Sequence, residues 1–166
     1  MKEEVILVNE ADEQIGVMEK MEAHEKGVLH RAFSVFIFND KGEMLLQQRA
    51  LNKYHSPDLW TNTCCSHPRP DEKTIDAAKR RLKEEMGIVC ELQFKSSFTY
   101  KTKFDNGLTE HEFDHVFIGR FNDTPEINPE EVNAWKWKNL REIKAELLSS
   151  PQSYTSWFKI ATDKLF

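Results

Sequence analysis

The 166-residue sequence lacks long apolar runs. Its hydrophobic stretches are much shorter than the roughly 20 residues that a membrane-spanning helix requires. The short apolar patch near the N-terminus is framed by acidic residues, unlike the pattern of a secretory signal peptide. These absences predict no membrane partner and a cytoplasmic location.

Cysteine is scarce and poorly placed for disulfides. The chain has three cysteines, an odd number, and two of them, Cys64 and Cys65, are neighbours that pair poorly. This pattern favours a reducing compartment and thiols kept for chemistry or for packing. A zinc ribbon would need a second metal-binding pair, which the sequence does not have.

An excess of basic residues is also missing. The chain has 23 Lys and Arg against 28 Asp and Glu, which gives a net charge of −5. Because nucleic-acid backbones favour basic surfaces, this balance argues against a nucleic-acid partner, although a local basic pocket can still bind a small anion. No nucleotide-binding glycine pattern is present, so we expect no flavin.

The hydrophobic patterns predict strands and helices in mixed order along the chain. Strands are expected over 5–8, 31–39, 43–50, 60–64, 91–104, 109–121 and 133–140. Turn signals, including Asn-Gly, predict that 31–39 pairs with 43–50 and 91–104 with 109–121 as hairpins. Helical spacing predicts helices over 71–86, 141–150 and 154–166. We therefore expect an α+β fold, with a mixed, mostly antiparallel sheet packed between helices, in a single domain over 1–166.

The helix predicted over 71–86 carries charged residues at regular spacing. Arg81 and Glu85 are four residues apart, as are Arg80 and Glu84, and such pairs often form only a solvated, ion-paired face. The segment also resembles the Nudix box, G-x5-E-x7-R-E-U-x-E-E-x-G-U. The matching letters fall on Glu72, Arg80, Leu82, Glu84, Glu85, Gly87 and Ile88.

Two positions depart from that box. Ser66 stands in place of the first glycine, and Arg81 in place of a glutamate. Nudix hydrolases use several helix carboxylates to hold divalent cations against a diphosphate. Because Arg81 removes a ligand and adds a positive charge, the resemblance implies a Nudix-like fold with an altered hydrolytic metal site.

Further candidate metal ligands lie outside the box. Glu110 and Glu112 share one face of a predicted strand, where they repel unless a cation or a proton intervenes, or unless that face is solvated. His24, His30 and His67 lie in three separate segments that no core pattern explains. These five side chains have the nitrogen and oxygen donors of a Zn²⁺ or Mn²⁺ site. Structural or solvated roles are the alternative, since spacing does not show that the side chains converge.

Several segments together resemble the type 1 isopentenyl diphosphate isomerases, which have a Nudix fold. The similarity runs from about Val5 to Trp157 and is most specific in WTNTCCSHP, AAKRRLKEEMGI, YKTKFDNGLTEHEFDHVF and SYTSWF. It implies reversible conversion of isopentenyl diphosphate to dimethylallyl diphosphate through a tertiary carbocation. It also implies a Nudix-like core over about 28–160, with the N-terminal segment 1–27 contributing to the site.

The resemblance implies roles for individual residues. Cys65 and Glu112 are the expected acid–base pair, with Tyr100 relaying a proton and Trp157 stabilising the cation through its π face. The substrate diphosphate is expected to bind Lys20, Arg49, Lys53, Ser66 and Arg81. The inner Zn²⁺ or Mn²⁺ site is assigned to His24, His30, His67, Glu110 and Glu112. Mg²⁺ is expected to bridge the diphosphate to Glu85. Cys64 and Cys90 are left as small buried hydrophobes.

Two other functions are compatible with parts of the sequence. A Nudix pyrophosphohydrolase of a nucleotide or prenyl diphosphate would explain the fold and the basic residues, but it leaves Cys65 and His67 without a role. A non-catalytic, zinc-stabilised binding module would have no use for the basic residues. We expect a monomer or a weak dimer.

Overall fold

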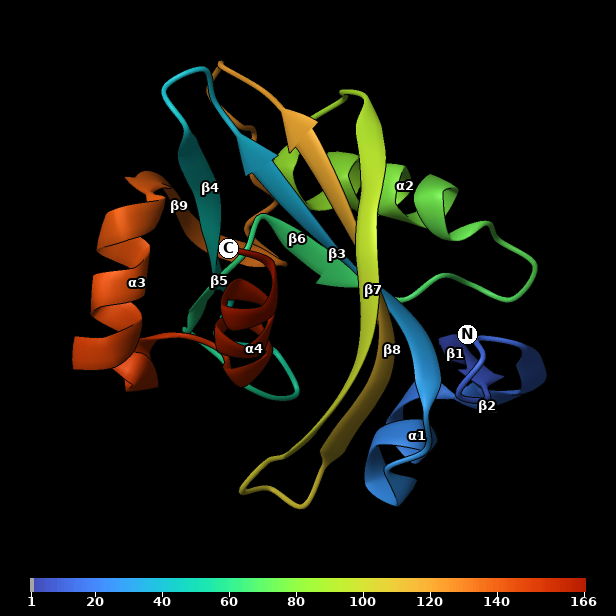
Figure 1. The fold of residues 1–166 in the computed structure, drawn as a ribbon. Coiled ribbons are helices and arrows are strands. Elements are labelled where there is room, and N and C mark those ends of the chain that lie inside the picture. The colour runs from blue at the N-terminus through green and yellow to red at the C-terminus, as the bar shows by residue number, and fades with distance from the viewer. Residues whose placement is uncertain (1) are drawn as a thin grey trace.

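The computed structural model describes residues 2–166, so Met1 of the expected N-terminal segment lies outside the described residues (Figure 1). In these residues the strands form one nine-stranded sheet with helices on both faces. The elements are β1 (Glu4–Val8), β2 (Gln14–Glu19), α1 (Lys20–Lys26), β3 (His30–Phe38), β4 (Glu43–Arg49), β5 (Trp60–Thr61), β6 (Cys64–Ser66), α2 (Thr74–Met86), β7 (Leu92–Lys103), β8 (Thr109–Arg120), β9 (Val132–Asn139), α3 (Leu140–Ser149), the 3-10 turn η1 (Pro151–Ser153) and α4 (Ser156–Leu165).

The sheet is mixed and mostly antiparallel, as predicted. Among the strand pairings in residues 2–166, β3 with β8 is the parallel one, running from His30 beside Glu112 to Phe38 beside Arg120. β7 and β8 form the long hairpin predicted from Asn106 and Gly107. Both edges of β3 are occupied, because β6 pairs antiparallel on the edge opposite β8.

The hairpin predicted from 31–39 and 43–50 is right at the turn and wrong beyond it. β3 and β4 pair only at Phe38 and Met44 and then separate. Neighbouring strands explain the separation, since β6 and β8 flank β3 while β5 and β9 pair with β4. The turn itself is held by Asn39, whose Oδ1 accepts hydrogen bonds from the backbone N–H groups of Lys41 and Glu43.

Two hydrophobic cores lie on opposite faces of the sheet, which confirms the predicted packing between helices. One core contains Leu82 and Met86 of α2, and the other contains Ile143 of α3 and Phe158 of α4. Figure 1 shows α2 on one side of the sheet and α3 and α4 on the other. Alternate residues of β3 point into the two cores, because side chains on a strand alternate between its faces.

The strand predicted over 60–64 is divided into β5 and β6 by Asn62 and Thr63. Thr63 Oγ1 donates to the carbonyl of Leu45 at 2.7 Å and accepts from the N–H of Ile37 at 2.9 Å. These buried side-chain bonds replace part of the backbone ladder, so the strand breaks there.

The N-terminal segment contains β2 and α1, which the hydrophobic pattern did not predict. Glu19 caps α1 by accepting from the N–H groups of Met21 and Glu22, and Gly27 ends it with a φ of 66°. None of the helices within residues 2–166 has both the length and the apolar character that crossing a bilayer requires.

Candidate active site

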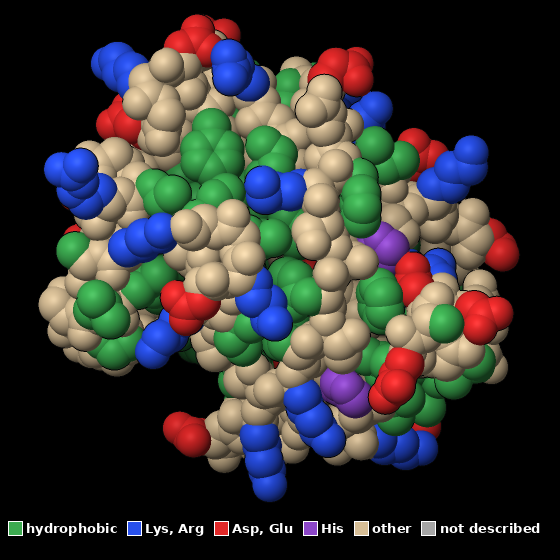
Figure 2. Space-filling model, viewed as in Figure 1, with side chains coloured by type: hydrophobic (Ala, Val, Ile, Leu, Met, Phe, Trp, Pro, Cys, Tyr) green, Lys and Arg blue, Asp and Glu red, His purple; other side chains and the backbone are tan. Residues whose placement is uncertain are grey.

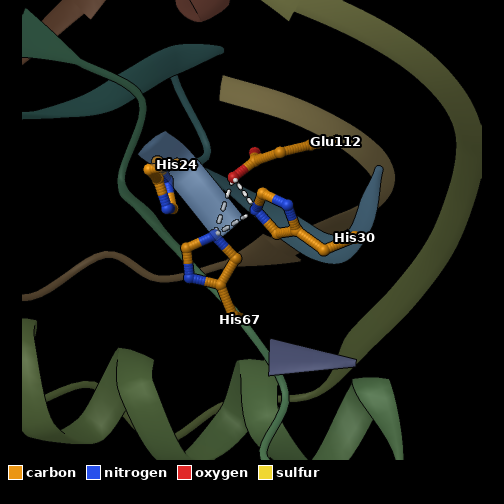
Figure 3. A group of neighbouring side chains, drawn as sticks. All are labelled: His24, His30, His67 and Glu112. Atoms are coloured by element: carbon orange, nitrogen blue, oxygen red, sulfur yellow. Dashed lines mark hydrogen bonds and ion pairs between the residues drawn. The ribbon is translucent and has the colours of Figure 1, made fainter. Parts of the chain in front are cut away.

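Four elements bring the predicted imidazoles and carboxylates together. His24 comes from α1, His30 from the start of β3, His67 from the segment after β6, and Glu110 and Glu112 from β8. Parallel pairing places His30 directly beside Glu112. Figure 3 shows His24, His30, His67 and Glu112 pointing toward a shared space.

The donor atoms of this cluster are close together. Glu112 Oε2 lies 2.7 Å from His67 Nε2 and 3.3 Å from His30 Nε2, and the two Nε2 atoms are 3.3 Å apart. His30 Nδ1 lies 2.8 Å from the carbonyl of Val28, and His24 Nδ1 lies 2.7 Å from that of Lys20. Because a carbonyl only accepts, both Nδ1 atoms carry a proton, so Nε2 is the ring nitrogen that each of these residues presents to the cluster.

Tyr100 links the two carboxylates. Its hydroxyl lies 2.5 Å from Oε1 of both Glu110 and Glu112, so one phenolic proton serves either carboxylate. Burial opposes ionisation of Glu112, but the imidazoles of His67 and His30 hold the pKa of its carboxyl well below the usual range. Burial also lowers the pKa of His67, to about 4, so its ring is neutral at pH 7.

This donor set fits a divalent transition metal. The ligand atoms of His24, His30, His67 and Glu112 lie within 4.8 Å of one another, and all four side chains are buried or nearly so. Nε2 of His24 is buried without a hydrogen-bond partner. The lowered pKa values of His67 and Glu112 favour a neutral imidazole and an ionised carboxylate, the protonation states that metal ligation requires.

A pocket of about 550 Å³ opens beside the cluster. His24 and His30 are fully buried behind it, while His67, Glu110, Glu112 and Tyr100 reach its wall. The other predicted site residues in the lining are Cys65, Trp157, Lys20, Arg49, Lys53, Ser66 and Arg81. In Figure 2, basic and acidic side chains are interspersed over the molecular face shown.

Adjacent cysteines on β6 point to opposite faces, as predicted. Cys64 is fully buried in the core, with its Sγ 3.4 Å from Glu85 Oε2. Cys65 faces the pocket, where its Sγ accepts from Trp157 Nε1 at 3.2 Å. Burial raises the pKa of the Cys65 thiol, so it is protonated at neutral pH. Cys90 packs, partly buried, against the core that contains Cys64.

Several basic residues of the pocket form ion pairs with acidic side chains. Arg81 contacts Glu85 at 3.0 Å and Glu131 at 3.2 Å, and Lys53 also pairs with Glu131. Glu85 is buried on α2 and is not in the cluster of imidazoles among the described residues. At the pocket wall, Lys20 lies 3.0 Å from Glu3.

Arg49 is positioned differently from the other basic residues. It is largely buried, and its Nη2 donates to the carbonyl of His55 at 3.1 Å. Its guanidinium lies 5.1 Å from the ring centre of Trp157, a cation–π arrangement. Arg49 therefore joins the basic side of the pocket to the wall that carries Trp157 and Cys65.

Other charged residues of the Nudix box form the ion-paired face that the spacing allows. Arg80 Nε and Nη2 contact the two carboxylate oxygens of Glu72 at 2.8 and 2.9 Å, and Nη1 reaches Glu84 at 3.3 Å. These residues thus stabilise α2 and the loop before it.

Three residues at the site were not predicted from the sequence: His55, Asn62 and Glu131. His55 stands in the loop between β4 and β5, where no periodic pattern applies, and its Nε2 lies 3.1 Å from Glu110 Oε2. Asn62 Oδ1 lies 3.6 Å from Cys65 Sγ. Asn62 belongs to the WTNTCC segment, which the sequence indicated as functional, but nothing in that segment distinguished Asn62 from its neighbours.

Residues 28–158 match the NUDIX domain family. Curated proteins of similar sequence include isopentenyl-diphosphate Delta-isomerase 2 of Aromatoleum aromaticum, 50% identical over 165 residues, which are 99% of this chain and 87% of that protein. The isopentenyl-diphosphate Delta-isomerase of Pectobacterium atrosepticum is 52% identical over 157 residues, 95% of this chain and 88% of that protein.

Solved structures give the same fold at lower identity. A protein from Deinococcus radiodurans aligns with a TM-score of 0.83 and 19% identity over 99% of both chains. A MutT protein from Methanosarcina mazei aligns with a TM-score of 0.68 and 20% identity, over 82% of this chain and 91% of that chain. These structural neighbours show the fold alone. The sequence relatives go further: the chain belongs to the isopentenyl-diphosphate Delta-isomerase family of NUDIX-domain proteins.

Proposed function

We propose that this chain interconverts isopentenyl diphosphate and dimethylallyl diphosphate, an isomerisation within isoprenoid biosynthesis. One observation carries the proposal: a single pocket is bordered by basic residues, by the Cys65 thiol and by the Glu110–Tyr100–Glu112 group. Basic residues suit a diphosphate, whereas the thiol and the carboxylates suit proton transfer to a hydrocarbon.

Two separated groups are needed because the double bond moves when one alkene carbon gains a proton and a neighbouring carbon loses one. Cys65 on β6 and Glu112 on β8 lie on opposite edges of β3. In register, Cys65 pairs with Ser34 and Glu112 with His30, so the two residues are also offset by four positions along β3. Both side chains line the pocket of about 550 Å³, which has room for a flat five-carbon chain. We assign the two proton transfers to this pair, with Tyr100 passing a proton to or from Glu112.

The surrounding side chains bind and protect the substrate. Arg49, Lys53 and Arg81, with Lys20 and Ser66, are proposed to hold the diphosphate, because guanidinium and ammonium groups pair with phosphate oxygens. Trp157 is proposed to present its ring to the cationic carbon. A desolvated contact of this kind is worth about 2 kcal/mol.

The proposed inner metal site consists of His24, His30, His67, Glu110 and Glu112, for Zn²⁺ or Mn²⁺. When bound, the ion would offset the repulsion between the two carboxylates and increase the acidity of Glu112. Mg²⁺ is proposed to bind Glu85 together with the substrate phosphate oxygens, since Mg²⁺ usually takes one or two carboxylates plus phosphate. We further propose one domain, acting in the cytoplasm as a monomer or weak dimer, with residues 1–27 completing the site around a core of about 28–160.

Phosphorus and proton NMR of isopentenyl diphosphate, incubated with the protein, Mg²⁺ and Zn²⁺, test the proposal. We expect dimethylallyl methyl signals with both phosphorus resonances of the diphosphate retained. Release of inorganic phosphate or pyrophosphate without isomerisation would support a Nudix hydrolase and contradict the proposal.

A further inference from the structure

His55 is a buried imidazole that the proposed metal site does not include. Its side chain is 2% exposed, and its Nε2 lies 3.1 Å from Glu110 Oε2. That contact does not have hydrogen-bond geometry, so Nε2 is buried without a hydrogen-bond partner. Leaving a buried polar atom unsatisfied is unfavourable, so the position of this nitrogen suits a ligand.

A second set of donors surrounds this atom. The ligand atoms of His24, His55 and Glu110 lie within 4.8 Å of one another, and all three side chains are buried. His24 belongs both to this set and to the set with His30, His67 and Glu112. Nε2 of His24, like that of His55, is buried without a hydrogen-bond partner. Two imidazole nitrogens are thus directed at the same carboxylate oxygen without hydrogen bonding to it.

Side chains from other segments hold the His55 ring, which lies in the loop between β4 and β5, in place. The ring stacks on Phe104 with centroids 4.4 Å apart and an interplanar angle of 14°, and it meets Trp157 edge-on at 5.4 Å. The His55 carbonyl accepts from Arg49 Nη2 at 3.1 Å. Nδ1 lies 3.4 Å from Ser56 Oγ, which can accept a hydrogen bond from it. A ring protonated on Nδ1 keeps a lone pair on Nε2.

We propose that His55 Nε2 is a fourth imidazole ligand of the metal centre, binding beside His24 and Glu110. This rests on the proposed metal centre and extends it to six protein donors, four nitrogens and two carboxylates. His55 adds no charge, so it increases affinity for a nitrogen-preferring cation such as Zn²⁺ without altering the charge balance of the cluster. The same ring contacts Trp157, and it therefore connects the metal centre to the wall of the pocket.

Long-range ¹H–¹⁵N NMR of the Zn²⁺-loaded wild-type protein, labelled with ¹⁵N-histidine, tests this assignment. A ligand has its metal on Nε2 and its proton on Nδ1, whereas a residue that only hydrogen-bonds Glu110 has its proton on Nε2. We expect the first tautomer for His55. The second, in a protein that holds zinc, would overturn the ligand assignment and leave the proposed function intact.

Affinity for Zn²⁺, measured by competition with a chromophoric chelator, provides a second readout. We expect His55→Gln to weaken binding at least about tenfold. His111→Gln is the matched control, because His111 lies on β8 between the two glutamates but its Nδ1 contacts the Gly27 carbonyl at 3.2 Å on the other face. Equal affinity of His55→Gln and wild type would contradict the proposal. Wild-type protein that retains no zinc would contradict the whole metal centre, His55 included.

Discussion

At the scale of single residues, Tyr100 has an unusual position. Its hydroxyl lies 2.5 Å from the buried carboxylates of both Glu110 and Glu112 and so links them. It also lines the pocket, and it pairs with Glu112 across the β7–β8 ladder. Its hydroxyl is thus suited to proton transfer rather than to substrate binding.

Tyr100→Phe should therefore lower kcat by about 10²-fold or more, the usual range for removing a proton-transfer group. KM should change little, because the phosphate-binding side chains remain. Steady-state kinetics on isopentenyl diphosphate measure both values. Tyr154→Phe is the control, since that hydroxyl bonds Glu146 outside the pocket. A Tyr100→Phe enzyme with wild-type kcat would contradict the proposed relay.

Glu72 offers a test of pH dependence that does not involve the metal site. Its hydrogen bonds with Arg80 lower the pKa of the carboxyl below its usual value of 4.5. A lowered pKa gives stability that is present above the unfolded pKa and is lost as pH falls through the folded pKa. Below pH 4.5, the unfolded chain therefore binds this proton more readily than the folded one.

We expect Glu72→Gln to reduce the free energy of unfolding at pH 7 by about 1 kcal/mol, because the pair is partly exposed. The difference from wild type should shrink as pH falls below 4.5. Urea denaturation at several pH values measures it, with the exposed Glu25→Gln as control. A difference that stays constant down to pH 3 would show that the ion pair does not cause it.

At the scale of elements, Gly87 sets the end of α2. Its φ is 66°, in the left-handed region, and an added Cβ would lie 2.7 Å from Glu126 Cβ and from the Glu126 carbonyl oxygen. Gly42 has a similar φ of 77° but no atom within 4 Å of the added Cβ. Comparison of the two glycines therefore separates backbone strain from steric clash.

We expect Gly42→Ala to cost about 1 kcal/mol from backbone strain alone. Gly87→Ala should cost about 2–4 kcal/mol, because the clash with the Glu126 backbone adds to the strain. Thermal unfolding measures both, and each kcal/mol corresponds to about 2–4 °C for a chain of this size. Equal losses in the two variants would contradict the close packing of Gly87 against Glu126.

The sequence predicted elements well where the pattern is local. Asn-Gly at 106–107 predicts the β7–β8 hairpin, and the spacing of Leu82 and Met86 predicts α2. Local patterns gave wrong or missing predictions where long-range contacts or capping determine the structure. β3 leaves β4 because β6 and β8 occupy its edges, and α1 has a polar, seven-residue sequence that depends on capping at Glu19 and Gly27.

The candidate site could be predicted only with help from the family resemblance. Alternation on the strand placed Glu110 and Glu112 on one face, and it separated Cys65 from Cys64. The convergence of His24, His30 and His67 depends on the packing of α1, β3 and the segment after β6, which no local spacing encodes. His55 lies in a loop, so neither helical nor strand periodicity could indicate it.

At the scale of the whole molecule, the cluster joins segments that are far apart in the sequence. Its side chains come from α1, the start of β3, the segment after β6, and β8. A ligand that binds only the folded state stabilises it, by about 2.7 kcal/mol when the free ligand is at 100 times its Kd. Metal bound at this cluster should therefore stabilise the fold and connect the N-terminal segment to the sheet.

Chelation of the metal should lower Tm by about 5–10 °C at such a saturation, and added Zn²⁺ should restore it. Differential scanning calorimetry measures the change. His67→Gln should show a smaller response to the chelator, whereas His111→Gln should respond as the wild type does. An unchanged Tm in chelator, for protein shown to contain metal beforehand, would mean that the ion does not stabilise these contacts.

The central claim is that Cys65 takes part in proton transfer to and from the hydrocarbon. Proton NMR of isopentenyl diphosphate in D₂O, with wild-type protein, Cys65→Ala and Cys90→Ala, tests it most directly. We expect deuterium-containing dimethylallyl diphosphate with wild type and with Cys90→Ala, and none with Cys65→Ala. Formation of the same labelled product by Cys65→Ala at the wild-type rate would contradict it.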